Sequence, residues 1–213
     1  ILFASSSSKV IVPHLQDVIQ ADGAHTSFGK YTLFSAYGTT ANGNMSPLAF
    51  GIMFGNEDTG NWTKLWEFVK EIHPSVNALQ TTILTDQDKG STAAISAIMP
   101  EAHQFHCSYH RRQNIIKNCG GHGQTPLTAL WMYNLLCGSN NMSQLESTQK
   151  TNYPKMHPTD RHYLTKIDDR MQYPAARCSM GPNICMYGHS ASSDVESMNN
   201  ANDLARKKAA VDI

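Results

Sequence analysis

The spacing of apolar residues changes near residue 60 of this 213-residue chain, and the change restricts the fold more than any other feature. Between Asn61 and His73 the apolar residues recur at the three- and four-residue spacing of one helical face. Before residue 60, β-branched and aromatic stretches alternate with turn residues, which is typical of strands. The sequence therefore predicts a block of strands followed by an amphipathic helix.

Three stretches before that helix predict strands with short connections. The first covers residues 14–22 and ends at Asp22, because Asp22-Gly23 interrupts the pattern. The second and third cover residues 31–37 and 47–54, and residues 41–44 supply the turn between them. Strands joined this closely predict an antiparallel meander.

Strands and helices alternate in the next part of the chain. After the helix at 61–73 we expect a strand at 81–85, a helix at 90–99, a short strand at 104–107 and a helix at 108–118. A meander followed by strand–helix units predicts an α/β fold with a sheet of mixed direction.

The remainder of the chain has a weaker pattern. Residues 128–137 and 193–210 are helical in character. Residues 138–188 are rich in Asn, Ser, Pro, Tyr and Met, and this stretch is either a loop-rich insertion or a poorly packed linker. The chain starts at Ile and ends without a helix stop, so we expect further parts of the protein on both sides.

Composition excludes several classes of protein. No run approaches 18 apolar residues, so we expect no transmembrane helix and no membrane partner. Lys and Arg number 17, as do Asp and Glu, so contacts with nucleic acid must come from local patches or from another domain. Five irregularly spaced cysteines argue against a disulfide framework.

Two aspartates follow predicted strands. Asp22 comes at the end of the first strand and Asp86 at the end of the fourth. If these strands are neighbours, the two carboxylates lie side by side and form hard oxygen ligands for Mg²⁺ or Mn²⁺. The alternative is that both are ordinary turn residues, and position alone favours it.

A third acid and a Cys-x-x-His motif are further candidates. Glu196 could join the aspartates, but Ser193-x-x-Glu196 also fits a helix capping box. Cys107 and His110 could form half of a zinc site. No second half has convincing spacing, so we favour a packed cysteine beside a hydrogen-bonded histidine.

These motifs together resemble the MULE (Mutator-like element) transposases. The resemblance covers about residues 14–118 and returns at 193–202. It rests on the order and spacing of several short motifs. They are Asp22-Gly23-Ala24-His25-Thr26, Pro47-Leu48-Ala49-Phe50 with Glu57 and Trp62, Leu84-Thr85-Asp86-Gln87-Asp88-Lys89-Gly90, and Phe105-His106-Cys107-Ser108-Tyr109-His110 with Asn114.

The resemblance implies an RNase H-like fold with an Asp-Asp-Glu triad made by Asp22, Asp86 and Glu196. The core would start with residues 14–118 and end with a helix in 189–213, with a mostly helical insertion at 119–188. Cys107 and His110 match a motif that is structural or DNA-related and lies outside the triad. Asp88 could be a substitute ligand, but we favour a role in capping the helix near Gly90.

The implied activity is metal-dependent DNA strand cleavage and strand transfer at transposon ends. Two Mg²⁺ or Mn²⁺ ions would be held by the triad. The partners would be terminal-repeat and target DNA, with a homo-oligomer in the active complex and a nuclear location. The alternative is a captured or decayed transposase-derived protein that regulates transcription or binds DNA without cleaving it, and a third interpretation is a different RNase H-like nuclease.

Two basic clusters are candidate DNA contacts. The alternative for both is an ordinary solvated helix face. The first cluster follows the Cys-x-x-His motif and the second follows Glu196: they are Arg111, Arg112 and Lys117, and Arg206, Lys207 and Lys208.

Overall fold

The computed structural model contains a six-stranded mixed sheet and eight α-helices within the residues that it describes, which are 1–26, 30–87, 89–120 and 125–181. The strand order is β1-β4-β3-β2-β5-β6. The predicted α/β class with a mixed sheet is therefore confirmed. The strands are β1 (Leu2–Phe3), β2 (Leu15–His25), β3 (Tyr31–Thr40), β4 (Met45–Phe54), β5 (Thr82–Thr85) and β6 (His103–His106).

The direction of the strands changes at β2. Strand β2 pairs antiparallel with β3 and β3 with β4, as the predicted meander requires, and β1 pairs antiparallel with β4. By contrast, β5 pairs parallel with β2, and β6 pairs parallel with β5. The turn from β3 to β4 contains Gly43 with a φ of 79°, a conformation that glycine adopts without steric cost. One prediction is wrong: β2 does not end at Asp22 but runs on to His25.

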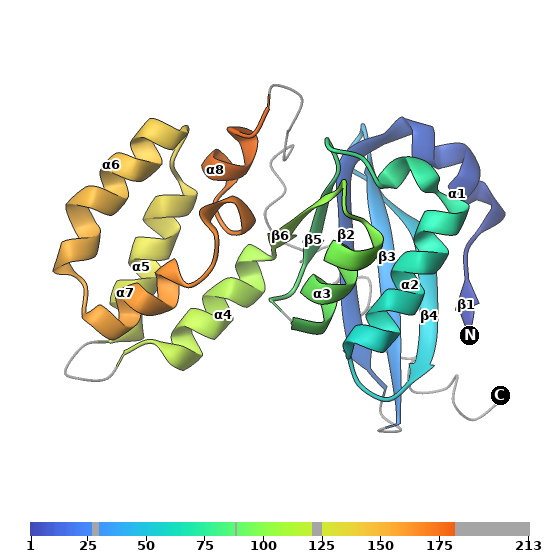
Figure 1. Cartoon of the computed structure of the whole chain (residues 1–213), viewed down its shortest axis with the longest axis horizontal. Coiled ribbons are helices and arrows are strands. Elements are labelled where there is room, and N and C mark those ends of the chain that lie inside the picture. The colour runs from blue at the N-terminus through green and yellow to red at the C-terminus, as the bar shows by residue number, and fades with distance from the viewer. Residues whose placement is uncertain (27–29, 88, 121–124, 182–213) are drawn as a thin grey trace.

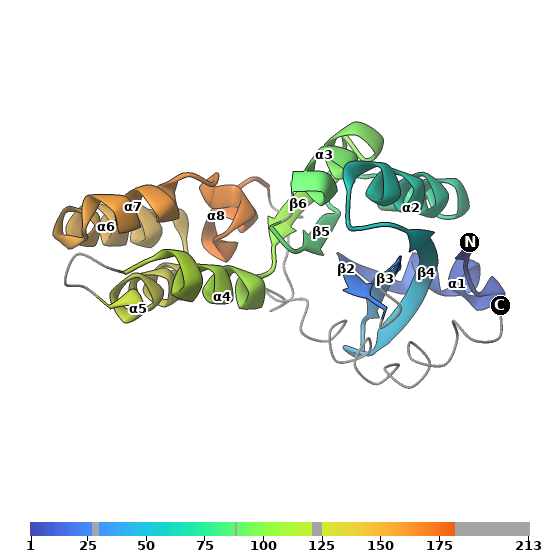
Figure 2. The ribbon, with the colours of Figure 1, turned by 90° about the horizontal axis from the view of Figure 1, so that it is seen from below.

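Helices α2 (Thr59–Ile72) and α3 (Lys89–Ile98) cover one face of the sheet (Figure 2). Asp58 caps α2 by accepting a hydrogen bond from the Asn61 N–H at 2.8 Å. The predicted apolar face of α2 is buried, and Trp62 lies edge-on to Phe34 of β3 with the ring centroids 4.9 Å apart. Burial of these large side chains fixes α2 on the sheet.

The face of the sheet opposite α2 and α3 carries the alternate side chains of the same strands. Ile19 and Ala21 belong to the core under α2 and α3, whereas Val18 packs with Leu84 and Phe105 in a separate small cluster. Because side chains alternate along a strand, residues 18, 20 and 22 of β2 share the face opposite α2 and α3. Asp22 therefore lies on that opposite face.

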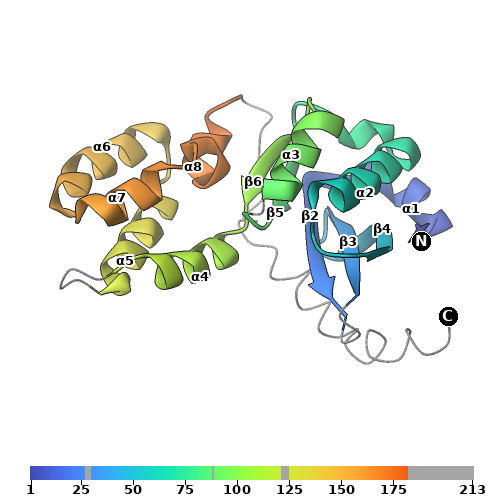
Figure 3. The same cartoon turned by 60° about the horizontal axis from the view of Figure 1, so that its bottom comes forward.

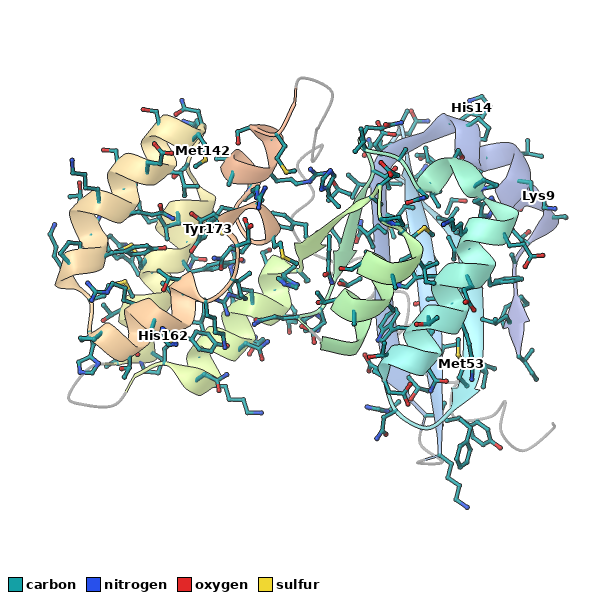
Figure 4. All side chains as sticks on the ribbon, viewed as in Figure 1. Lys9, His14, Met53, Met142, His162 and Tyr173 are labelled. Carbon is teal, nitrogen blue, oxygen red and sulfur yellow. The ribbon has the colours of Figure 1, made fainter. Side chains whose placement is uncertain are left out.

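A helical unit, which we define as residues 108–178, lies beside the β6 edge of the sheet (Figure 1). Figure 3 shows α4 leaving β6 and leading into this unit. The buried core of the unit includes Tyr133, Leu145, Leu164 and Tyr173, and Tyr173 lies between its helices (Figure 4). Its helices are α4 (Ser108–Asn118), α5 (Pro126–Cys137), α6 (Met142–Asn152), α7 (Pro158–Thr165) and α8 (Pro174–Cys178).

Two fully buried arginines join the helical unit to the sheet. Arg177 of α8 donates to the Thr82 hydroxyl of β5 at 2.8 and 3.0 Å. Arg111 of α4 donates to the Gln87 side-chain oxygen at 3.1 Å and to the Tyr163 carbonyl at 3.0 Å. Residues 142–178 contain α6, α7 and α8 and share a buried core, contrary to the interpretation of residues 138–188 as a loop-rich insertion or a poorly packed linker.

Two short elements near the N-terminus were not predicted. They are β1, which pairs with β4, and α1 (Ser6–Ile11), whose Ser5 cap accepts a hydrogen bond from the Ser7 N–H. Within the described residues, no helix is long and apolar enough to span a membrane.

Helices α2 and α3 meet so closely that Gly90→Ala should destabilise the protein. A β-carbon at Gly90 would lie 2.9 Å from the Thr59 backbone nitrogen and 3.0 Å from the Glu57 carbonyl oxygen. Alanine normally stabilises a helix relative to glycine by about 1 kcal/mol, but this overlap with backbone should reverse the sign and cost about 1–3 kcal/mol. Urea unfolding measures the difference.

Gly60→Ala is the matched control for that prediction. In α2 its added β-carbon meets Asp58 at 3.4 Å, an ordinary contact, so this variant should be neutral or more stable. Equal stability of the two variants would contradict the close approach of the helices.

Candidate active site

Asp22 and Asp86 lie on neighbouring parallel strands in matching register. Val18, Ile19 and Gln20 of β2 pair with residues 82, 83 and 84 of β5. The same offset places Asp22 opposite Asp86, which directly follows β5. Neighbouring strands are about 4.8 Å apart, so the two carboxylates share one edge and one face of the sheet. The structure thus brings together the two aspartates that the sequence predicted to meet.

The two aspartates differ in their surroundings. The side chain of Asp86 is 40% exposed, whereas Asp22 as a residue is only 9% exposed. Asp86 accepts a hydrogen bond from the Gln87 N–H, which holds its carboxylate near the end of β5. The pair is therefore open to solvent on the Asp86 side.

His110 lies against this pair, although the resemblance placed it outside the triad. Its Nδ1 atom is 4.0 Å from Asp86 Oδ1. A hydrogen bond with the Cys107 side chain, together with the negative charges of Asp86 and Asp22, raises the pKa of His110 to about 9, against the effect of burial. The contact depends on the strand order of the sheet, because β6 lies next to β5 and the loops that follow these parallel strands meet at the same sheet edge.

Cys107 and His106 complete this edge. Cys107 is buried and precedes the first turn of α4, so it packs as the sequence analysis favoured. Burial and the charge of Arg111 lower the pKa of His106 to about 4. In the part of the chain that the structure describes, no group of three or more His, Cys, Asp or Glu side chains is placed to hold a metal ion.

Glu57 lies on the other side of β2 from Asp22. Its carboxylate covers Gly23 so closely that a β-carbon there would lie 2.3 Å from the Glu57 Cδ atom. Its Oε1 atom is 3.9 Å from His25 Nε2. A glycine after Asp22 therefore lets a second acidic side chain approach the strand.

The basic residues predicted to contact DNA differ in their exposure to solvent. Arg112 and Lys117 are exposed on α4, but Arg111 is fully buried beneath Tyr163, with its guanidinium carbon 4.7 Å from the ring centroid. Arg111 is therefore wrong as a candidate DNA contact. Outside the described residues lie Glu196, Asp88, Arg206, Lys207 and Lys208.

From the shifted pKa values of His106 and His110 we expect the protein to be most stable near pH 6.5 in metal-free buffer. The raised pKa of His110 stabilises the fold below pH 6.5, and this contribution disappears as the pH rises towards 9. The lowered pKa of His106 destabilises the fold as the pH falls from 6.5 towards 4, because only the unfolded chain takes up the proton. We expect a loss of about 1–3 kcal/mol on each side.

Urea unfolding across this pH range, in the presence of a chelator, measures the effect. His110→Gln should remove the alkaline decline and leave the acid one. A wild-type profile that is flat from pH 5 to 8 would contradict both pKa shifts.

A mixed sheet, two in-register aspartates and a following Cys-x-x-His motif occur together in this chain, and its sequence is similar to a transposase-type domain. The family model described as "MULE transposase domain" matches residues 18–114. This confirms the predicted resemblance for the part of the chain that carries both aspartates and His110.

A relative in Arabidopsis thaliana gives a more particular similarity. The chain is 30% identical over 125 residues to "Protein FAR1-RELATED SEQUENCE 6", a match that covers 57% of this chain. The match covers 17% of that protein, so the chain spans only a small part of its length.

Proposed function

We propose that this chain is the catalytic core of a transposase with an RNase H-like fold, which cleaves DNA strands and joins them in a metal-dependent reaction. The observation that carries the proposal is the register of Asp22 with Asp86 across two parallel strands. The match of residues 18–114 to the MULE transposase domain supports it. On this basis we also propose a nuclear location, terminal-repeat and target DNA as partners, and a homo-oligomer in the active complex.

The donor atoms at this edge suit a hard divalent cation such as Mg²⁺ or Mn²⁺. Asp22 and Asp86 supply carboxylate oxygens from fixed strand positions, and Glu196 is the proposed third ligand. Bound there, the metal ions would supply Lewis acidity and an activated water for attack on a phosphodiester. Zinc fits less well, because Cys107, the sulfur ligand that the motif would supply, is buried in the packing at the start of α4.

The protein's own groups would orient the reaction. Asp22 is held in β2, which pairs with a strand on each side, and Asp86 is held by the Gln87 N–H. His110 lies 4.0 Å from Asp86 and can hold that carboxylate in place or contact a phosphate oxygen beside it. Precise placement of this kind accounts for most of the catalysis in phosphoryl transfer.

The second candidate function is DNA binding without cleavage, in a captured or decayed transposase. The contact between His110 and Asp86 favours it, because the positive charge of a protonated His110 competes with a divalent cation for that carboxylate. Both functions require contact with DNA, so cleavage is the property that separates them.

Incubation of the whole chain with supercoiled plasmid tests the proposal. We expect nicks that require Mg²⁺ or Mn²⁺ and that a chelator abolishes. DNA binding with no nicking under any metal condition, in a preparation that is folded by circular dichroism, would favour the second function.

A further inference from the structure

The two units of this neutral chain carry opposite net charges. Residues 108–178, the helical unit, contain nine Lys and Arg against four Asp and Glu, a net charge of +5. Residues 1–107, the sheet unit, contain five against nine, a net charge of −4. A polyanion is attracted by the first unit and repelled by the second, so any such partner should lie on the helical unit.

Helix α4 presents an exposed stripe that begins beside the carboxylates. The stripe, which we call the α4 stripe, follows one helical face and consists of Tyr109, Arg112, Gln113, Ile116 and Lys117. Helix α4 contains no acidic residue, and its 11 residues span about 16 Å. The stripe therefore leads away from Asp86 and His110 without meeting an acid on its own helix.

The groups around the α4 stripe extend its positive charge. Lys166 directly follows α7, and its Nζ atom lies 3.9 Å from the centroid of the Tyr163 ring, whose hydroxyl accepts a hydrogen bond from Asn118 at 3.3 Å. Lys166 is thus next to the end of α4 that carries Lys117. The nearby acid of α7, Asp160, is buried and accepts a hydrogen bond from the Gly120 N–H, so it is turned away from solvent.

Arg112 is oriented for a phosphate contact. Its Nε atom donates to the Asn134 side-chain oxygen at 2.9 Å, a bond that does not use either Nη group. A guanidinium held in this way presents two donors in a fixed plane, which matches the geometry of a phosphate. Tyr109, one helical turn before Arg112, is exposed, and its ring lies edge-on to the His110 ring with the centroids 5.6 Å apart.

We propose that the α4 stripe, with Lys166, binds the phosphate backbone of double-stranded DNA and leads it to the edge that carries Asp22 and Asp86. The inference rests on the proposed function only for what happens at that edge, because binding of the backbone itself requires no metal. Its basis is the charge of the helical unit, the exposed basic groups of α4 and the continuity of the stripe with the paired aspartates.

The salt dependence of binding to a short DNA duplex of mixed sequence, measured by fluorescence anisotropy with the whole chain in a chelator, tests this inference. Each phosphate contact contributes about 0.9 to the slope of log affinity against log salt concentration. Arg112→Gln with Lys117→Gln should lower the slope by about 2 and weaken binding about tenfold or more in low salt. Lys166→Gln should lower it further by about 1.

Lys9→Gln with Lys64→Gln is the matched control. Both lysines are exposed on the sheet unit, and the change in net charge is identical. We expect wild-type binding from this control. The inference is overturned if the α4 variant binds like the wild type, if the control loses as much affinity, if the wild type does not bind, or if an RNA duplex binds more tightly than DNA.

Failure of the inference can be distinguished from failure of the proposed function. Asp86→Asn should bind the duplex in chelator at least as well as the wild type, whatever its effect on cleavage. A reduced salt slope in the α4 variant together with no nicking by the wild type would sustain the inference and remove the proposed catalysis. If the wild type nicks DNA but its DNA affinity does not depend on Arg112 and Lys117, the proposed catalysis stands and the inference about the α4 stripe fails.

Discussion

Asp86→Asn should eliminate metal-dependent cleavage of DNA while the protein remains folded. The amide keeps the size of the side chain but removes the negative charge that would hold a divalent cation beside Asp22. Because ligands that act together are not independent, the single change should lower the cleavage rate on the order of a thousandfold or more. The measurement is plasmid nicking in Mg²⁺ and in Mn²⁺, compared with the wild type.

Two further variants make this result specific. Asp22→Asn should have the same effect as Asp86→Asn, since the two residues lie opposite each other at one edge. Asp17→Asn changes the same residue type on the same strand but away from that edge, so it should cleave at the wild-type rate. Near-wild-type nicking by either edge variant would show that the paired aspartates are not the catalytic ligands.

Arg111→Met should cost about 2–4 kcal/mol of unfolding free energy. Methionine fills much of the space of the arginine stem, but it leaves the Gln87 side-chain oxygen and the Tyr163 carbonyl without the donors that Arg111 supplies. Each acceptor left buried and unpaired costs about 1–3 kcal/mol. Urea unfolding, followed by tryptophan fluorescence and circular dichroism, measures the change.

Arg112→Met is the control because it makes the same substitution one position further along α4. Arg112 is exposed, and its bond with Asn134 is at the surface, so the loss should stay below about 1 kcal/mol. If the two variants were equally stable, the hydrogen bonds of Arg111 would not be what holds the helical unit to the loop after β5.

The parts of the fold that the sequence predicted are those where one face of an element is buried. The helix at 61–73 was predicted within two residues of α2, because Trp62, Leu65 and Trp66 pack on one side against the sheet. The end of β2 was placed too early, since Asp22-Gly23 has the composition of a turn. In the fold, Gly23 continues the strand and provides room for Glu57.

The helical unit was harder to predict for a physical reason. Helix α5 was predicted at 128–137 and begins two residues earlier, at Pro126, but α6, α7 and α8 were not predicted. The core of the unit also relies on Tyr133 and Tyr173, whose ring centroids are 5.9 Å apart, and tyrosine gives little periodic signal. Helices α7 and α8 are short and begin at proline.

The candidate site was predicted in part. Asp22 and Asp86 could be paired from their places after strands, because parallel neighbours end at one edge. The burial of Arg111 could not be predicted, since its partner Tyr163 is 52 residues away and an arginine beside exposed Arg112 has the pattern of a solvated face. The contact of His110 with Asp86 likewise depends on β6 lying next to β5.

The bond between Arg177 and Thr82 bears on the order in which the chain folds. It joins residues 95 positions apart, whereas β3 and β4 are joined by a tight turn and β5 and β6 by one helix. Closing so long a loop costs more chain entropy than closing a hairpin, and the contact gains nothing until β5 is in place. We therefore expect the sheet to form first and to act as a template on which α8 docks last, so that a kinetic probe at Arg177 reports a slower phase than one at Trp66.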